Sequence, residues 1–286
     1  MKFFKGLIIT ILLLVIIVAG ALIGVNEYTK SKYEIDLFRT VAELKTLTEE
    51  VDESEICDHA FSDEDMVDVQ EIVNESVENL ISYTVQNGFS VNFNDLPDEM
   101  KSIITLSDKQ VGALAQTVLE QEVGSKITLA DKQIEVELRQ VKFLNVTSLG
   151  ASVNTVITVD LTPFISEVPN EFPFNLLLDK IPQTLYVSST IKIEKGETPF
   201  SYTVSSEEFC INNLSSSDTA DLFHTIDVIA KVGSAQEWNM QIGNALANAL
   251  IGNDEDKGIA YSLRVIGATT YTFEEIDGKS YYKVLR

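Results

Sequence analysis

The chain has 286 residues, of which 45% are hydrophobic, and its formal net charge at pH 7 is −23. This apolar content is enough to build a packed core and excludes a globally disordered chain. All 44 acidic residues follow residue 25, which excludes nucleic-acid binding through phosphate contacts. The same charge repels anionic lipid head groups, so any membrane contact beyond an anchor must be apolar.

The first feature along the chain is an uncharged apolar segment of nineteen residues, Leu7–Val25. At about 1.5 Å per residue, a helix of this length reaches roughly 28 Å, enough to cross the hydrocarbon core of a bilayer. Lys2 and Lys5 precede it without an acidic residue, which is typical of a signal sequence. The pattern predicts a single-pass signal anchor with a cytoplasmic N-terminus and the bulk of the chain outside. Cleavage near Ala21, in an A-x-A-like site, would instead give a secreted protein.

Residues 27–100 are predicted to form a helical stalk, an acidic loop and a further helix. Apolar residues at helical spacing indicate the stalk at 27–48. The loop at 49–65 contains nine acidic residues and no basic one, but it lacks the spacing of a calcium-binding loop, so we expect it to be solvated. Ser62, with Asp65 three residues later, is a helix start signal, and the helix is expected to end at Asn87-Gly88.

The two cysteines, Cys57 and Cys210, fit an extracytoplasmic location, because one disulfide could join them there. Their spacing does not show whether they are close, so two free thiols are the alternative. Cys57 and His59 lie in the acidic loop, where flanking carboxylates would raise the pKa of a thiol. We therefore expect an incidental surface pair rather than a nucleophile and its base.

Residues 101–286 are predicted to form an α+β domain. Ser107 to Gln110 is a capping box for a helix that ends at Gly124. The apolar period then changes from about 3.6 to 2, which is typical of an antiparallel sheet with one buried face. Strands are expected at 134–138, 153–161, 185–193 and 200–204. Two further helices are expected after Ser215 and after the capping box at Ser234, followed by strands at 259–265, 269–275 and 281–285.

The segment at 162–183 is unusually apolar for a connection between strands, and it contains four of the six prolines. A loop of this length and composition either covers something or binds something. One interpretation is a flap that seals the end of the sheet. The other is an apolar lip on a ligand groove, for which the candidate residues are Phe164, Phe172, Phe174, Leu177, Trp238 and Ile242.

No motif in the sequence indicates catalysis or a cofactor. Only two histidines occur, His59 and His224, which together with two cysteines do not make a convincing zinc site. Walker, G-x-G-x-x-G, G-x-S-x-G and H-E-x-x-H motifs are absent from the sequence. We therefore expect a protein that is not an enzyme and that binds no metal or cofactor.

The order of elements resembles a known family. An apolar span precedes a helix that begins with LSDKQVGALAQTVL, alternating strands, the stretch FPFNLLLDKIPQTLYVSSTIKI, a long helix and closing strands. Over about residues 104–275 this order is similar to that of YpmS-like membrane-anchored proteins of Gram-positive bacteria, which resemble the tubular lipid-binding (TULIP) fold. The resemblance implies a curved antiparallel sheet packed with long helices, an apolar tunnel for acyl chains, and no catalytic residues.

These observations predict three parts: a signal anchor or transmembrane helix at 1–26, the stalk, acidic loop and helix at 27–100, and the α+β, TULIP-like domain at 101–286. The predicted function is that of an extracytoplasmic, membrane-tethered module that binds a lipid or another apolar ligand without catalysis. The alternative is a structural or interaction protein of the cell envelope that holds a protein partner and has no small-molecule ligand.

Overall fold

The computed structural model describes residues 30–31, 36–84, 88–91, 102–123, 126–129, 132–162, 182–230, 233–253 and 258–286. The predicted anchor Leu7–Val25 and most of the apolar segment 162–183 lie outside these residues. Among the helices in the described ranges, none is both long and apolar enough to cross a membrane.

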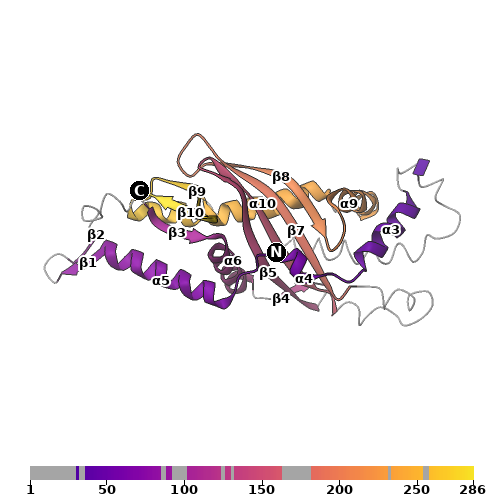
Figure 1. Cartoon of the computed structure of the whole chain (residues 1–286), viewed down its shortest axis with the longest axis horizontal. Coiled ribbons are helices and arrows are strands. Elements are labelled where there is room, and N and C mark those ends of the chain that lie inside the picture. Colours follow the sequence, from indigo (N-terminus) through magenta and orange to yellow (C-terminus); the bar gives the residue numbers. More distant parts are fainter. Residues whose placement is uncertain are drawn as a thin grey trace.

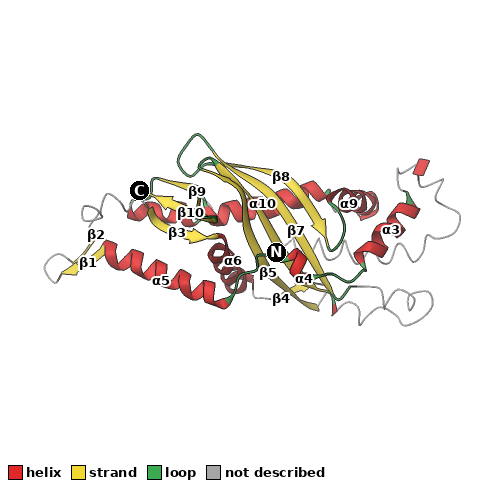
Figure 2. Cartoon of the chain, in the orientation of Figure 1, coloured by secondary structure: helices red, strands yellow, loops and turns green. Residues whose placement is uncertain are grey.

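The described chain is an α+β protein with antiparallel sheets, as the sequence predicts (Figure 2). The strands of the five-stranded sheet, in order, are β4 (Lys126–Leu129), β5 (Lys132–Thr147), β6 (Gly150–Asp160), β7 (Thr184–Lys195) and β8 (Tyr202–Ile211). The three-stranded sheet has the order β3 (Ser102–Ser107), β10 (Lys279–Leu285) and β9 (Thr270–Ile276), and the two-stranded sheet pairs β1 (Ile81–Thr84) with β2 (Gly88–Val91).

The helices lie around these sheets (Figure 1). They are α3 (Leu37–Leu47), α4 (Glu53–Ile56), α5 (Asp63–Leu80), α6 (Asp108–Val123), α9 (Ser216–Ala230), α10 (Ala235–Leu250), α11 (Ile259–Ser262) and the 3₁₀ helix η1 (Leu263–Ile266).

The inner face of the five-stranded sheet carries much of the apolar packing. Every second residue along β6 and β7 lies on this face, where Val153, Val187 and Ile191 are buried. Helix α10 packs on it against β7 and β8 (Figure 1). A Cβ atom at Gly243 of α10 would lie 2.8 Å from Val204 Cγ1 and 2.9 Å from Ile191 Cγ2, so the glycine allows the close approach of helix and sheet.

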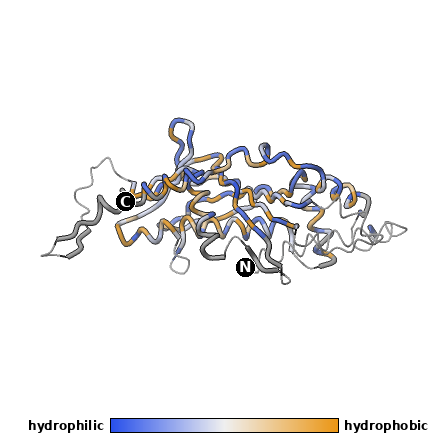
Figure 3. Tube along the Cα trace, turned by 90° about the horizontal axis from the view of Figure 1, so that it is seen from below, coloured by the Kyte–Doolittle hydropathy of each residue, from blue (hydrophilic) through white to orange (hydrophobic). Residues whose placement is uncertain are grey.

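Strand β5 runs well beyond the strand predicted at 134–138, and it contains a β-bulge. The pairing with β6 shifts between Leu138 and Gln140, which makes Arg139 the extra residue. The apolar residues on the inner face accordingly occupy even-numbered positions up to Leu138 and odd-numbered positions at Val141 and Phe143. Alternation therefore continues on the same face as far as Phe143, and a second register shift follows between Leu144 and Thr147. Hydrophobic and hydrophilic residues alternate along much of the described trace (Figure 3).

A buried asparagine stabilises a bulge in β8. Asn239 of α10 is 0% exposed, and its amide nitrogen donates to the carbonyl oxygens of Thr190 and Glu208, both at 3.0 Å, and to Ser206 Oγ at 2.7 Å. Its oxygen accepts a hydrogen bond from Ser189 Oγ at 2.5 Å. The register of β7 and β8 shifts at this point, so Asn239 satisfies carbonyl groups at an irregular part of the ladder.

The three-stranded sheet packs around aromatic side chains. Tyr271, Phe273 and Tyr282 are fully buried and contact one another, with ring centroids 5.5 to 6.2 Å apart. Tyr271 donates its hydroxyl to the carbonyl of Ser201 at 2.8 Å, and Tyr282 donates to the carbonyl of Leu250 at 2.7 Å. These bonds join the smaller sheet to the turn before β8 and to the end of α10.

Two predicted elements are wrong. Residues 81–84, predicted as the end of a helix, form β1 and pair with Gly88–Val91, in keeping with the strand preference of β-branched and aromatic residues. Residues 259–265, predicted as a strand, form α11 and η1 instead. The alternation of apolar and polar residues there is coincidental: Ala260 is the buried residue of α11, and Ser262 N–H donates to the carbonyl of Gly258 to close a helical turn.

The chain enters the domain through a segment that we call the strap, residues 36–62. It begins with α3, which packs against α9, and continues through α4 across the outer face of the five-stranded sheet. Its last residues contact the N-terminus of α6, and α5 follows in the chain. The described residues of the predicted stalk and acidic loop are thus packed against the α+β part.

Candidate functional site

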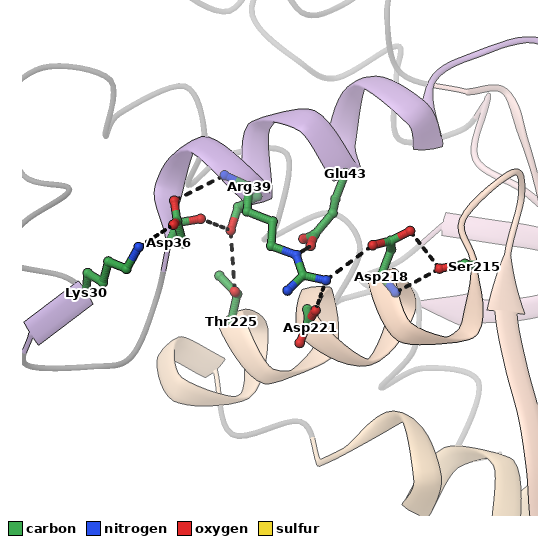
Figure 4. A network of polar contacts seen from close by, with 9 residues as sticks. Lys30, Asp36, Arg39, Glu43, Ser215, Asp218, Asp221 and Thr225 are labelled. Atoms are coloured by element: carbon green, nitrogen blue, oxygen red, sulfur yellow. Dashed lines mark hydrogen bonds and ion pairs between the residues drawn. The ribbon is translucent and has the colours of Figure 1, made fainter.

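The strap is held at its start by one arginine between three carboxylates (Figure 4). Arg39 Nε lies 3.0 Å from Glu43 Oε1, one turn further along α3. Its Nη2 lies 3.3 Å from Asp218 Oδ1 and also forms an ion pair with Asp221, both on α9. This network joins segments that are 179 residues apart in the sequence.

Glu43 is the buried member of this network. It is 5% exposed, and burial raises its pKa to about 7, against the opposing effect of Arg39. Its Oε1 makes no well-aligned hydrogen bond to any described residue, although Arg39 Nε is near. Ligand atoms of Glu43, Asp218 and Asp221 lie within 4.8 Å of one another, which is close enough for a metal ion. The guanidinium of Arg39 already supplies the positive charge there, so we assign no metal.

Two asparagines after β8 hold the middle of the strap. Asn212 donates its side-chain amide to the carbonyl of Leu47 at 2.9 Å and accepts from the backbone of Tyr186 at 2.8 Å. Its φ of 49° is a left-handed conformation that asparagine tolerates better than most residues. Asn213 donates to the carbonyl of Glu50 at 3.1 Å. The turn between β8 and α9 is therefore shaped to bind the backbone of the strap.

The outer face of β5 holds the next part of the strap by charge and backbone contacts. Arg139, the bulge residue, forms an ion pair with Glu53 at 2.8 Å, and Lys142 Nζ lies 2.5 Å from Asp58 Oδ2. Gln140 Oε1 accepts a hydrogen bond from the backbone N–H of His59, the strap residue after Asp58, at 2.7 Å. These exposed ion pairs contribute little individually, but together they fix the register of strap against strand.

The strap ends at the N-terminus of α6. His59 Nε2 lies 2.8 Å from Asp108 Oδ1, and Asp108 also accepts the backbone N–H of Phe143 at 3.3 Å. The ring of Phe61 lies against Gly112, where an added Cβ would come within 2.4 Å of Phe61 Cδ1. His59 is therefore not the incidental surface residue that the sequence predicts, because it connects the strap to the first turn of α6.

A cleft of about 460 Å³ lies between the strap and the outer face of the sheet. Its floor is a chain of polar side chains across β5, β6 and β7. Gln140 Nε2 donates to Asn154 Oδ1 at 2.8 Å, and Asn154 Nδ2 donates to Ser188 Oγ and Thr190 Oγ1, both at 3.0 Å. Because Ser188 precedes Ser189, which bonds to α10 on the inner face, the cleft lies on the opposite side of the sheet from α10.

A second hollow of about 310 Å³ adjoins the cleft at Tyr186, which lines both. Its lining is acidic and contains one basic residue, Arg139. The four carboxylates that line it belong to Glu53, Glu135, Glu137 and Asp160.

The two described members of the predicted apolar groove, Trp238 and Ile242, are buried in the core on α10, with exposed fractions of 4% and 8%. The Trp238 ring lies 6.3 Å from that of Phe223, which in turn lies 5.6 Å from Phe209. The remaining members, Phe164, Phe172, Phe174 and Leu177, lie outside the described residues, so a groove shared by all six stays a prediction.

The structure shows where the apolar segment 162–183 leaves and rejoins the sheet. The backbone N–H of Leu161 donates to the carbonyl of Gln183 at 2.7 Å, so both ends of the segment meet at one point. Leu161 and Leu185, which flank this point, are buried. Asn239 binds Ser189 of β7, and this contact fixes the start of α10 over the same half of the strand.

Of the two alternatives for Cys57 and Cys210, a disulfide or two free thiols, the structure has two free thiols. Cys57 ends α4 and donates its backbone N–H to the carbonyl of Glu53, whereas Cys210 lies within β8 opposite Ser188. Each cysteine is thus held by its own element. Burial, reinforced by neighbouring carboxylates, raises the pKa of both thiols.

No family model matches the chain, and no curated protein or solved structure is significantly similar to it. What the protein does must therefore be inferred from its own residues and their geometry.

Proposed function

We propose that the chain is a non-catalytic module, tethered to a cell membrane by Leu7–Val25 with its bulk outside the cytoplasm, that binds a lipid or another apolar ligand. A curved sheet packed with long helices, as the resemblance to YpmS-like and TULIP proteins implies, would supply the walls of the ligand site.

The observation that carries this proposal is the attachment of the apolar segment 162–183. Both of its ends are joined by one hydrogen bond at the end of the sheet whose inner face holds Leu185. The start of α10, with Trp238, lies over the same strand. A proline-rich apolar segment whose two ends meet at this point has a composition suited to contact an acyl chain.

The chemistry of the described residues also supports a role without catalysis. Both thiols have a raised pKa, so each stays protonated and weakly nucleophilic at neutral pH. The Nε2 atom of His59 is hydrogen-bonded to Asp108, and this contact attaches the strap to α6. Neither arrangement resembles a nucleophile paired with a base.

Photo-crosslinking tests this proposal. The full chain in membranes is supplied with a fatty acid that carries a diazirine near its methyl end, irradiated and digested for peptide mapping. We expect adducts in 163–181 and on α10, in addition to those on the anchor. Adducts confined to Leu7–Val25 would show contact with bulk lipid alone and would contradict the proposal.

A second candidate is a structural or interaction protein of the cell envelope, and the strap favours it. Contacts from Arg39 to Phe61 attach the chain that follows the anchor to both sides of the domain. Such a connection would hold the domain in a fixed orientation beside the membrane, as a scaffold requires. Chemical cross-linking in cells tests this function: a reproducible neighbouring protein supports it, and no reproducible neighbour counts against it.

A further inference from the structure

We propose that the cleft beneath the strap is a binding site for a neutral saccharide. The cleft, of about 460 Å³, lies within the usual size range of small-molecule sites. It lies on the outer face of the sheet, whereas the proposed lipid site lies on the inner face. The two proposals therefore stand or fall separately.

The floor of the cleft suits a ligand rich in hydroxyl groups. Asn154 uses both amide protons on Ser188 and Thr190, and its oxygen accepts from Gln140. The floor is thus oriented in advance by its own hydrogen bonds. Among the described residues, neither the hydroxyl proton of Ser188 nor the second amide proton of Gln140 has an acceptor, so both are available to a ligand. Saccharide hydroxyls both accept and donate, so they can use such groups.

The walls of the cleft add apolar surface of the kind that a sugar ring can contact. Ile56 of the strap and Leu144 of β5 line it, together with Tyr186 of β7. An aromatic ring with a polar end is suited to a ligand that has both C–H faces and hydroxyl edges. An acyl chain fits less well, because it would leave the polar floor without partners.

Charge restricts the ligand further. Lys142, the basic residue among those that line the cleft, is paired with Asp58, and Glu55 lies nearby in the lining. Beyond Tyr186, four carboxylates and one arginine line the adjoining hollow. An acidic sugar or a phosphate would be repelled, so the site selects an uncharged saccharide.

Calorimetry and saturation-transfer NMR on the full chain in phosphatidylcholine nanodiscs test this inference, since neither uses a sugar-based detergent. The probes are maltotriose and tri-N-acetylchitotriose, with glucuronic acid and inorganic phosphate as anionic comparisons. We expect saturable binding of at least one neutral trisaccharide below about 10 mM, in the range of weak specific binding, and no binding of the anions.

Two variants of one residue locate the site. Ser188→Tyr fills the cleft and should weaken binding at least about tenfold, whereas Ser188→Ala removes one hydrogen bond and should weaken it roughly fivefold. The matched control is Thr203→Tyr, because Thr203 of β8 lies on the same outer face of the sheet as Ser188 but outside the cleft lining; this variant should bind normally. If Ser188→Tyr does not fold, Ser188→Ala decides. No saturable binding of either trisaccharide, equal binding of the anions, or binding that neither Ser188 variant weakens would overturn the inference.

Discussion

The charge of Glu43 should determine how firmly the strap is held against α9. Its pKa is about 7 in the folded protein, compared with 4.5 for the group in water. The folded state therefore keeps its proton over a pH range in which the unfolded chain releases it. The stabilisation is complete below pH 4.5 and is lost as the pH rises to 7, a change of about 3 kcal/mol in the free energy of unfolding.

The cause of this penalty can be separated by substitution. Burial raises the pKa of Glu43 first, Arg39 opposes it, and Asp221 and Asp218 raise it further. Glu43→Gln keeps the shape of the side chain without its charge. We expect this variant to be about as stable as the native chain at pH 4.5 and more stable at pH 8 by up to about 3 kcal/mol, because the pKa of about 7 already includes the attraction to Arg39.

Urea unfolding at pH 4.5 and pH 8, with hydrogen exchange of residues 36–47, measures both effects. Glu49→Gln, at an exposed position of the same strap, is the control and should leave the pH dependence as it is. A Glu43→Gln variant with the native pH dependence, or one less stable than the native chain at pH 8, would refute the reasoning.

Three further predictions concern packing and the thiols. Asn239→Ala removes the side-chain donor from the buried carbonyl of Thr190 and the partly buried carbonyl of Glu208, so urea unfolding should give a free energy of unfolding lower by about 3 kcal/mol. A change below about 1 kcal/mol, the low end of that scale, would mean that water replaces the amide. Gly112→Val should displace the ring of Phe61 and cost roughly 2 kcal/mol, and Phe61→Ala should relieve most of that cost in a double-mutant cycle; full additivity would show that the two residues are not in contact. Cys57 and Cys210 should each react with iodoacetamide at pH 7 more slowly than a solvent-exposed cysteine in a short peptide, because the pKa of both thiols is raised. Mass spectrometry without reduction should show two free thiols, and a mass lower by two hydrogens would reveal a disulfide.

Local sequence patterns predicted most helices and strands of the α+β part, because the interactions that specify them join residues close in the sequence. The capping box at Ser234 is present in the structure: Ser234 N–H donates to Glu237 Oε2 at 2.8 Å, and Glu237 N–H donates to Ser234 Oγ at 3.2 Å. The alternation at 153–161 and 185–193 corresponds to β6 and β7. The strand predicted at 259–265 is wrong because alternation over seven residues also fits two short helices, which the contact of Tyr261 N–H with the carbonyl of Ile251 selects.

The strap contacts could not be predicted in the same way, because each joins residues distant in the sequence. Arg39 lies 179 residues from Asp218, and Asn212 lies 165 residues from Leu47. Neither pair has a spacing that indicates contact, and polar residues in an acidic loop are usually solvated. The bulge at Arg139 had a visible sign, the change from even-numbered to odd-numbered apolar positions. That sign locates the bulge but does not identify Glu53 as the partner of Arg139.

The proposed lipid-binding function is tested most directly by the mass of the folded chain after the anchor, residues 36–286, which we call the body. A protease site inserted within residues 26–35 allows the full chain to fold in a membrane and its body to be released afterwards, free of the lipids around the anchor. Native mass spectrometry of the released body should then show a population that carries one lipid molecule. A folded body found only at its bare mass would contradict the proposal that this membrane-tethered module binds an apolar ligand.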